Sequence, residues 1–287
     1  MSALVPAGYA TLEKRIALGL ELIDAARGGR VALPIGAAIE KRTPSRGSFA
    51  DELAPAVDRH GSCLFALVFD LTGKRPTRGA PRPSVTVRLT SRDRRFVPRR
   101  LRFELADPVE LDPSEPGPDH AAIERLRAAR SRRVALLPGA AYDAPGSSTG
   151  LRGRVLRGGA AVRWARVEAR SVLPSGAQGP VIGRAHGDDR GEFFLLLGAS
   201  PGPAAAASLS LPVEVTAFAP PPAPPPTAAQ RRDPLWDLPV EPVTAPGPVD
   251  PISSGESLPE GYTASAPRTV VFRLGAILSS EVPPFVV

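Results

Sequence analysis

The stretch HGDDRGEFFLLLG, residues 186–198, sets two aspartates and a glycine directly before an apolar run. Asp188 and Asp189 suit a turn, because a short carboxylate accepts hydrogen bonds from backbone N–H groups just ahead of it. Gly191 permits a positive φ, and the apolar run after it is typical of a core strand. A metal site would need further oxygen or imidazole ligands, which this spacing does not supply. We therefore predict a turn that enters a buried strand.

The same arrangement occurs once more upstream, in DRHGSCLFALVF at residues 58–69. In both copies a Gly-Gly turn lies 32 residues before the glycine of the Asp-turn, and the two copies are offset by 130 residues. Self-similarity at a fixed offset is typical of duplicated structural units. The positions predicted to form equivalent structural turns are Gly29, Asp58 and Gly61 in the first unit, and Gly159, Asp188 and Gly191 in the second.

Alternating apolar and polar residues, bounded by glycine and proline, surround both copies and predict strands. The first unit contains LGLELIDA (18–25), RVALPIGAAIE (30–40) and SVTVRLTS (84–91). The second contains TGLRGRVL (149–156), AAVRWARVEARSV (160–172) and LSLPVEVTAF (209–218). Several short strands per unit favour small antiparallel sandwiches. The predicted fold is all-β, with two tandem immunoglobulin- or transthyretin-like β-sandwiches, a short helix-bearing connector and a proline-rich C-terminal extension.

The predicted boundaries follow from changes in composition along the chain. A helix is expected over residues 10–17, and Asp119 is expected to cap a second one that runs to about Arg133. APPPAPPPTAAQ is expected to be extended, and RTVVFRLGAIL (268–278) to be a strand. The expected parts are an N-terminal arm (1–17), the first sandwich (18–105), the connector (106–147), the second sandwich (148–219), a proline-rich, irregular extension (220–268) and a strand returning to the second sandwich (269–287).

Composition limits the chemistry and the compartment. The 287 residues include 35 prolines and 27 glycines but one cysteine, so no internal disulfide can form. Cys63 follows His60 but falls within a predicted apolar strand, so a buried inert thiol is favoured over a nucleophile. The sequence shows no secretory signal and no run of 18 apolar residues, so we expect a cytoplasmic protein without a membrane span. No cofactor or metal is expected.

Positive charge is concentrated in the first predicted unit. The net charge is +7, and residues 1–105 hold 19 basic and 10 acidic residues, a local +9. RDRRFVPRRLRFEL (92–105) is the densest basic cluster. Few aromatic residues alternate with these arginines, which argues against nucleic acid and favours a protein partner. The candidate interface residues are Arg94, Arg95, Arg99, Arg100 and Trp236, with solvated arginines and a Trp236 that packs on its own domain as the alternative.

The second unit resembles the carboxypeptidase regulatory-like family of transthyretin-type sandwiches. The first unit fits more loosely, with Cys63 where the second has Phe193. The resemblance implies a stabilising or interaction module rather than an enzyme. The matching residues are Gly153, Val155, Gly158, Gly159, Ala165, Val167, Asp188, Asp189, Gly191 and Phe193.

The whole chain has a second resemblance, carried by LELIDAARGGRV (20–31), LLPGAAYDAP (136–145) and FRLGAILSSEVPPF (272–285). In this layout it is similar to accessory proteins encoded with bacterial contractile, phage-tail-like injection systems. The resemblance implies a non-enzymatic structural protein, a cap or baseplate-associated component whose partners are other protein subunits, with oligomerisation left open. The alternative is a carbohydrate- or surface-binding β-sandwich module.

Overall fold

The computed structural model describes residues 14–31, 34–40, 53–55, 57–58, 64–70, 84–105, 131–198, 209–228, 230–244, 250–279 and 281–287. These residues are mostly strand, which confirms the predicted all-β class. They contain no α-helix; the single helical element among them is the 3-10 turn η2 (Gln230–Arg232). In these ranges no helix is long and apolar enough to cross a membrane.

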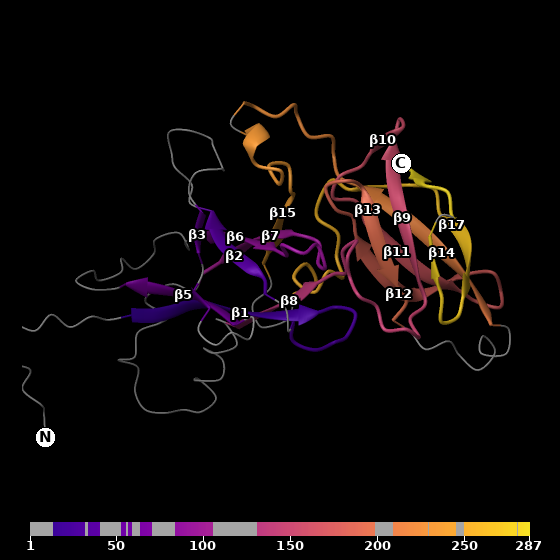
Figure 1. Cartoon of the computed structure of the whole chain (residues 1–287), viewed down its shortest axis with the longest axis horizontal. Helices are drawn as coiled ribbons and strands as arrows, with labels where there is room; N and C mark the ends of the chain where they lie inside the picture. The colour runs from indigo at the N-terminus through magenta and orange to yellow at the C-terminus, as the bar shows by residue number, and fades with distance from the viewer. Residues whose placement is uncertain are drawn as a thin grey trace, which may run out of the picture.

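The strands of the N-terminal half form two sheets, at one end of an elongated molecule (Figure 1). One sheet has the order β4-β5-β1-β8, and the other β15-β7-β6-β2-β3. Its last member, β15 (Val240–Val243), comes from the C-terminal part of the chain. The remaining strands are β1 (Lys14–Asp24), β2 (Gly36–Glu40), β3 (Leu53–Pro55), β4 (Val57–Asp58), β5 (Leu64–Asp70), β6 (Ser84–Thr90), β7 (Arg99–Glu104) and β8 (Ser131–Leu136).

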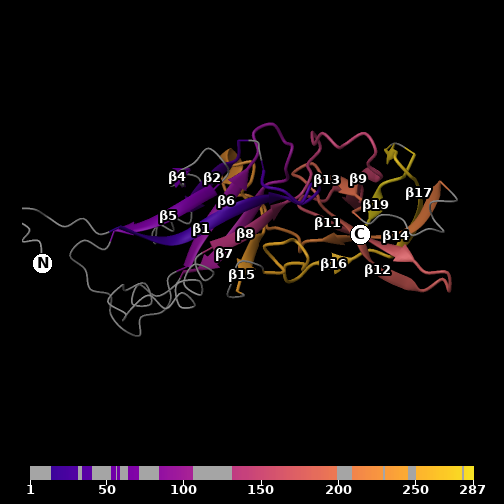
Figure 2. The same cartoon turned by 90° about the horizontal axis from the view of Figure 1, so that it is seen from below.

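The strands of the C-terminal half form two more sheets at the other end (Figure 2). One joins β10, β9 and β13 with β18 and β19; the other joins β12, β11 and β14 with β16 and β17. Their bounds are β9 (Gly150–Arg157), β10 (Ala160–Ala161), β11 (Arg166–Val172), β12 (Gln178–His186), β13 (Glu192–Leu196), β14 (Ser210–Ala219), β16 (Thr263–Ala264), β17 (Arg268–Arg273), β18 (Ile277–Leu278) and β19 (Phe285–Val286).

Two groups of strands share one pattern of pairing. In the first, β1 pairs antiparallel with β5 and parallel with β8, while β6 pairs antiparallel with β2 and β7. In the second, β9 pairs antiparallel with β13 and parallel with β18 and β19, while β14 pairs antiparallel with β11 and β17. The strands β2 and β11 each have a further antiparallel neighbour, β3 on β2 and β12 on β11.

Each half has its own apolar core, and β13 contributes to both. Phe193 and Phe194 point to opposite faces of this strand, as successive strand residues do. Phe193 belongs to the core of the second half, whereas Phe194 belongs to the core of the first. There the Phe194 ring lies 6.4 Å from that of Tyr142, which in turn lies 5.6 Å from Phe96. The two cores therefore meet through buried aromatic side chains.

Several expected elements differ from those observed. The predicted helix from Asp119 falls mostly outside the described residues, but its last residues, from Ser131, begin strand β8. The burial of β8 alternates, and it pairs in register with β1, so tertiary pairing overrides the helical pattern. The helix expected at 10–17 is likewise wrong from Lys14 onward, where β1 begins. Within the extension, expected to be irregular, β15 forms a regular strand on β7.

Candidate functional site

The two halves meet at a buried cluster of charged side chains. Strand β7 begins with Arg99, whose side chain is fully buried. Its guanidinium donates two hydrogen bonds to Glu241, at 2.5 Å from Nη2 and 3.2 Å from Nε. It also donates to the carbonyl oxygens of Ala135, Ser253 and Ile252, at 2.6 to 2.8 Å. A buried arginine with this many acceptors is held in one orientation.

Glu241 on β15 is shared between the two halves. Besides Arg99, its Oε1 accepts a hydrogen bond from Nη2 of Arg166 at 3.2 Å. Arg166 begins β11 in the second half, and its Nη1 also donates to the carbonyl of Trp164 at 3.1 Å. The side chains of all three charged residues are at most 4% exposed. One carboxylate on the C-terminal extension thus joins a cation from each half.

His186 is buried beside this cluster, at the end of β12. Burial, and secondarily the positive charges of Arg166 and Arg99, hold the pKa of His186 well below its ordinary value of 6.5. Within the described part of the chain its Nδ1 has no hydrogen-bond partner. The imidazole is therefore neutral at physiological pH, and it adds no third cation around Glu241.

A second ion-pair cluster fastens the extension to the outer face of the first half. Glu40 on β2 accepts hydrogen bonds from Arg88 and, at 2.7 Å, from Arg100. Arg88 also donates to Asp233 at 2.5 Å, and Arg100 to the carbonyl of Leu238 at 3.2 Å. The side chains of both arginines are nearly buried. The segment from 233 to 243 is therefore held to the first half at both ends.

These contacts change the interpretation of the arginine interface. Arg99 and Arg100 are buried inside the chain, so they offer no free surface to another subunit. Arg95 is partly exposed and pairs with Asp93 at 3.1 Å. Arg94 has a side chain 43% exposed and reaches Asp189 at 3.3 Å. Much of the positive charge predicted to meet a foreign acidic surface therefore meets carboxylates of the same chain.

The Asp-x-x-Gly stretch forms a turn, as predicted. Oδ1 of Asp188 accepts hydrogen bonds from the backbone N–H groups of Arg190 and Glu192, at 2.8 and 3.0 Å. Burial is the main reason that the pKa of Asp188 is raised. Gly191 has φ +71°, and a side chain there would meet the backbone of strand β9. Among the described residues no three His, Cys, Asp or Glu side chains are grouped to hold a metal.

The other predicted turn positions are described in part. Gly159 has φ +81° and closes the hairpin between β9 and β10. Gly29 lies in the turn after β1, where the positive φ belongs to Gly28 instead. Asp58 ends β4 opposite Phe65, but its side chain lies outside the described residues. Gly61, and with it His60 and Cys63, also falls outside them.

We call the cluster of Arg99, Glu241 and Arg166, where the two halves meet, the junction. A groove of about 840 Å³ opens beside it. One wall is the proline segment 220–226, and the other is the extension around Trp236. Between them, Tyr262 donates a hydrogen bond to the carbonyl of Trp164 at 2.9 Å. The indole of Trp164 donates to Asp237 at 2.8 Å, and Arg163 donates to the same carboxylate at 2.6 Å. The lining is mostly carbon, with a few charged groups set among aromatic rings and prolines.

Trp236 thus lies at this groove, where it is neither fully buried nor fully exposed. Sequence analysis identified Trp236 but not Glu241, Asp237 or Tyr262, which organise the junction and groove. The signal for Glu241 was weak: one acidic residue in VEPV, within a proline-rich stretch. Its partners Arg99 and Arg166 are 142 and 75 residues away, so no local pattern links them.

No family model matches this sequence, and neither a curated protein nor a solved structure was found to match it.

Proposed function

We propose that the protein is a non-enzymatic structural subunit that holds two β-sandwiches in a fixed orientation and joins other proteins in a larger assembly. The observation that carries the proposal is Glu241, buried between Arg99 and Arg166. Buried ion pairs are costly to desolvate, and their best-attested role is to fix one arrangement over others. A structural subunit that positions two partners relative to each other needs its own two halves to be held in one orientation.

The proposal includes two related sandwiches, each with two sheets around its own core. The shared pairing pattern supports this organisation, because β1, β2, β5 and β6 correspond to β9, β11, β13 and β14 in order and in direction. The Gly-Gly turns after β1 and β9 support it as well. A duplicated sandwich, like the family it resembles, is suited to stabilising or binding neighbours rather than to catalysis.

Within this class, we propose a cap or baseplate-associated component of a bacterial contractile, phage-tail-like injection system. The support is the resemblance of the chain's layout to the accessory proteins of such systems. We propose that it assembles in the cytoplasm, where the particles that this resemblance implies are put together.

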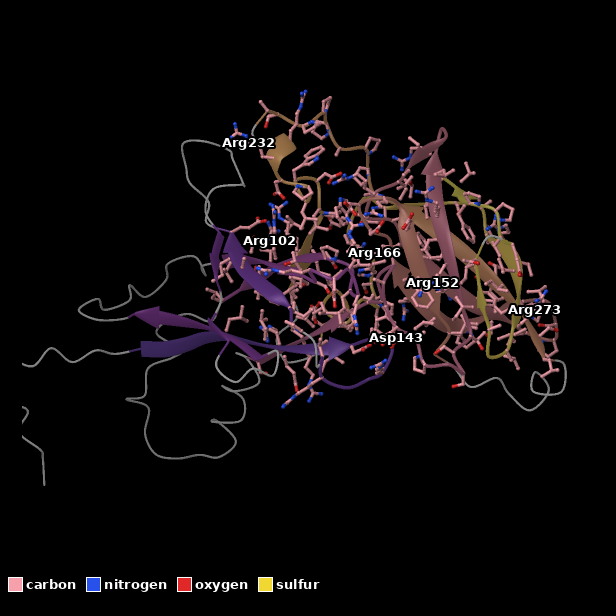
Figure 3. All side chains as sticks on the ribbon, viewed as in Figure 1. Arg102, Asp143, Arg152, Arg166, Arg232 and Arg273 are labelled. Atoms are coloured by element: carbon pink, nitrogen blue, oxygen red, sulfur yellow. The ribbon has the colours of Figure 1, made fainter. Side chains whose placement is uncertain are left out.

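Purification of the affinity-tagged full-length protein from its native host tests this function. The expected result is co-elution with sheath or tube subunits at high mass, identified by mass spectrometry. A Glu241→Gln variant is expected to retain less of that material, whereas Arg273→Glu, at the exposed far end of the second half, is expected to retain all of it (Figure 3). A protein that always elutes as a lone monomer contradicts the assembly function.

The second candidate function is a carbohydrate- or surface-binding module. Trp236 and Tyr262 favour it, because aromatic side chains in a groove are typical of sites that stack sugar rings. It predicts that a soluble oligosaccharide occupies the groove, whereas the assembly function predicts a protein segment there.

A further inference from the structure

We propose that the groove beside the junction binds an extended, acidic segment of a partner protein, with apolar side chains alternating with the acidic ones. The inference rests on the proposed assembly function and names the surface and the chemistry through which one partner docks. Three features of the groove carry it: its shape and lining, its charge, and its fixed walls.

The lining favours an extended chain with apolar anchors. At about 840 Å³, the groove has room for several residues. Its walls are the proline segment 220–226 and the residues around Trp236, while Tyr262 lies between them. Prolines 221, 222, 224 and 225 are exposed and present rigid carbon surfaces that lose little entropy when a ligand packs on them. A partly exposed tryptophan is the residue type most often found to dominate such contacts.

The charge of the groove favours an acidic ligand. Arg102, Arg157 and Arg163 line it, together with Asp237 and Glu260. Asp237 neutralises Arg163 at 2.6 Å, and Arg157 donates to the neutral carbonyl of Pro220 at 3.1 Å. Among the described residues, Arg102 and Arg157 therefore have no carboxylate partner, and Glu260 is the one carboxylate of the lining without a cation partner.

Arg102 is the best placed of these cations to bind a carboxylate. It projects from the outer face of β7, where its neighbours in the strand, Leu101 and Phe103, point into the core. Its side chain is exposed, and no carboxylate of the described residues pairs with it. A guanidinium presents a fork of donors that fits a carboxylate with two parallel hydrogen bonds. Figure 3 shows Arg102 on the first half, below Arg232 and to the left of Arg166.

The walls of the groove are fixed before any ligand arrives. Asp237 is held by Trp164 and Arg163, and the preceding segment is held by Arg88 through Asp233. Trp164 has φ +60°, an uncommon conformation for a bulky residue, and hydrogen bonds with Asp188, Asp237, Tyr262 and Arg166 maintain it. A preformed groove binds an extended chain at a lower entropic cost than a surface that must first become ordered.

Titration with three synthetic 12-residue peptides tests this inference. One alternates glutamate with leucine, one glutamine with leucine, and one lysine with leucine; a soluble maltoheptaose serves as the sugar. Binding is measured by intrinsic tryptophan fluorescence and by calorimetry at low and at physiological salt. We expect the glutamate peptide to bind at least about tenfold more tightly than the glutamine peptide, and the lysine peptide not to bind.

Substitutions localise the binding to the groove. Trp236→Ala is expected to weaken binding by about tenfold or more at either salt concentration. Arg102→Glu is expected to weaken it more at low salt than at high salt, since screening reduces the contribution of an exposed charge. Arg273→Glu makes the same change of charge on β17, away from the groove, and is expected to leave binding unchanged. Circular dichroism confirms that each variant is folded.

Each outcome is decisive. Equal binding of the three peptides, or equal loss in the Arg102 and Arg273 variants, overturns the inference. Binding of maltoheptaose that Trp236→Ala abolishes, without binding of the glutamate peptide, assigns the groove to a sugar instead. Peptide binding together with a monomeric protein in the native host would retain the groove and refute the proposed assembly. An assembly that survives Trp236→Ala and Arg102→Glu would retain the proposed assembly and refute the groove as its docking site.

Discussion

Nη2 of Arg99 lies 2.5 Å from Oε2 of Glu241, although 142 residues separate them in the chain. Neither side chain is more than 1% exposed. Glu241 also contacts Arg166, so the removal of its charge leaves two buried guanidinium groups without their counter-ion.

Glu241→Gln is therefore expected to lower the free energy of unfolding by about 3–5 kcal/mol, the cost of breaking a buried ion pair on one side. Urea denaturation followed by circular dichroism measures it. The matched control is Glu192→Gln, because Glu192 pairs with Arg154 on the surface at 3.3 Å and is expected to contribute less than about 1 kcal/mol. Equal losses in the two variants would contradict a special role for the junction.

Gly191→Ala is expected to destabilise the protein more than Gly176→Ala. Both glycines have positive φ, +71° and +79°, so each substitution carries a backbone penalty of about 1–2 kcal/mol. A side chain at Gly191 would also lie 3.0 Å from the carbonyl oxygen of Val155, whereas the space at Gly176 is open. The difference in midpoint of thermal unfolding isolates the cost of crowding. Identical midpoints would show that the turn relaxes freely.

Stability is expected to depend on pH through His186. Its pKa in the folded protein lies below the ordinary value of 6.5, so the unfolded chain binds more protons as the pH falls. The contribution of the neutral imidazole to the free energy of unfolding is complete above about pH 6.5. Below that pH the free energy of unfolding falls, with a slope of up to about 1.4 kcal/mol per pH unit.

Urea denaturation between pH 5 and pH 7 measures this slope. His186→Gln is expected to remove the slope. Subtracting the curve of the variant from that of the wild type cancels the contributions of the other histidines and of the carboxylates. A wild-type curve parallel to that of the variant would show that His186 gains a proton in the folded state without penalty.

Tyr142→Phe is expected to cost about 1–3 kcal/mol, because it removes a donor from a buried carboxylate. The hydroxyl of Tyr142 contacts both carboxylate oxygens of Asp24, at 2.8 and 3.0 Å, and the ring contacts with Phe96 and Phe194 remain in the variant. A double-mutant cycle with Asp24→Asn measures the coupling between the two side chains. A coupling energy near zero would mean that the hydroxyl contributes nothing through Asp24.

The strands that sequence analysis predicted are those whose pattern is local. The apolar run after Gly191 and the alternation at 210–219 need no distant partner to be recognised, and both are strands. Strand β8 was missed because an arginine-rich segment that follows a helical pattern does not show that its alternate residues become buried on β1. The predicted turn at Asp188 was recoverable for the same local reason.

The junction was not recoverable from sequence. Arginine is rarely buried unless it is paired, so Arg99 and Arg100 in a dense basic cluster were predicted to be exposed. Their partners are Glu241 and Glu40, which lie 142 and 60 residues away. Trp236 was singled out by its type alone, and its position at the groove depends on ion pairs that hold the extension against the first half.

The position of the extension affects how the chain folds during its synthesis. Strand β15 completes the sheet of β7, and Glu241 follows Arg99 by 142 residues. During synthesis the first half therefore leaves the ribosome with the edge of β7 unpaired and Arg99 without its counter-ion. Contacts this distant in sequence slow folding, and unpaired strand edges promote aggregation. The N-terminal half thus reaches its final structure only after the second half has been translated, and a nascent chain stalled before residue 240 exposes the β7 edge to chaperones.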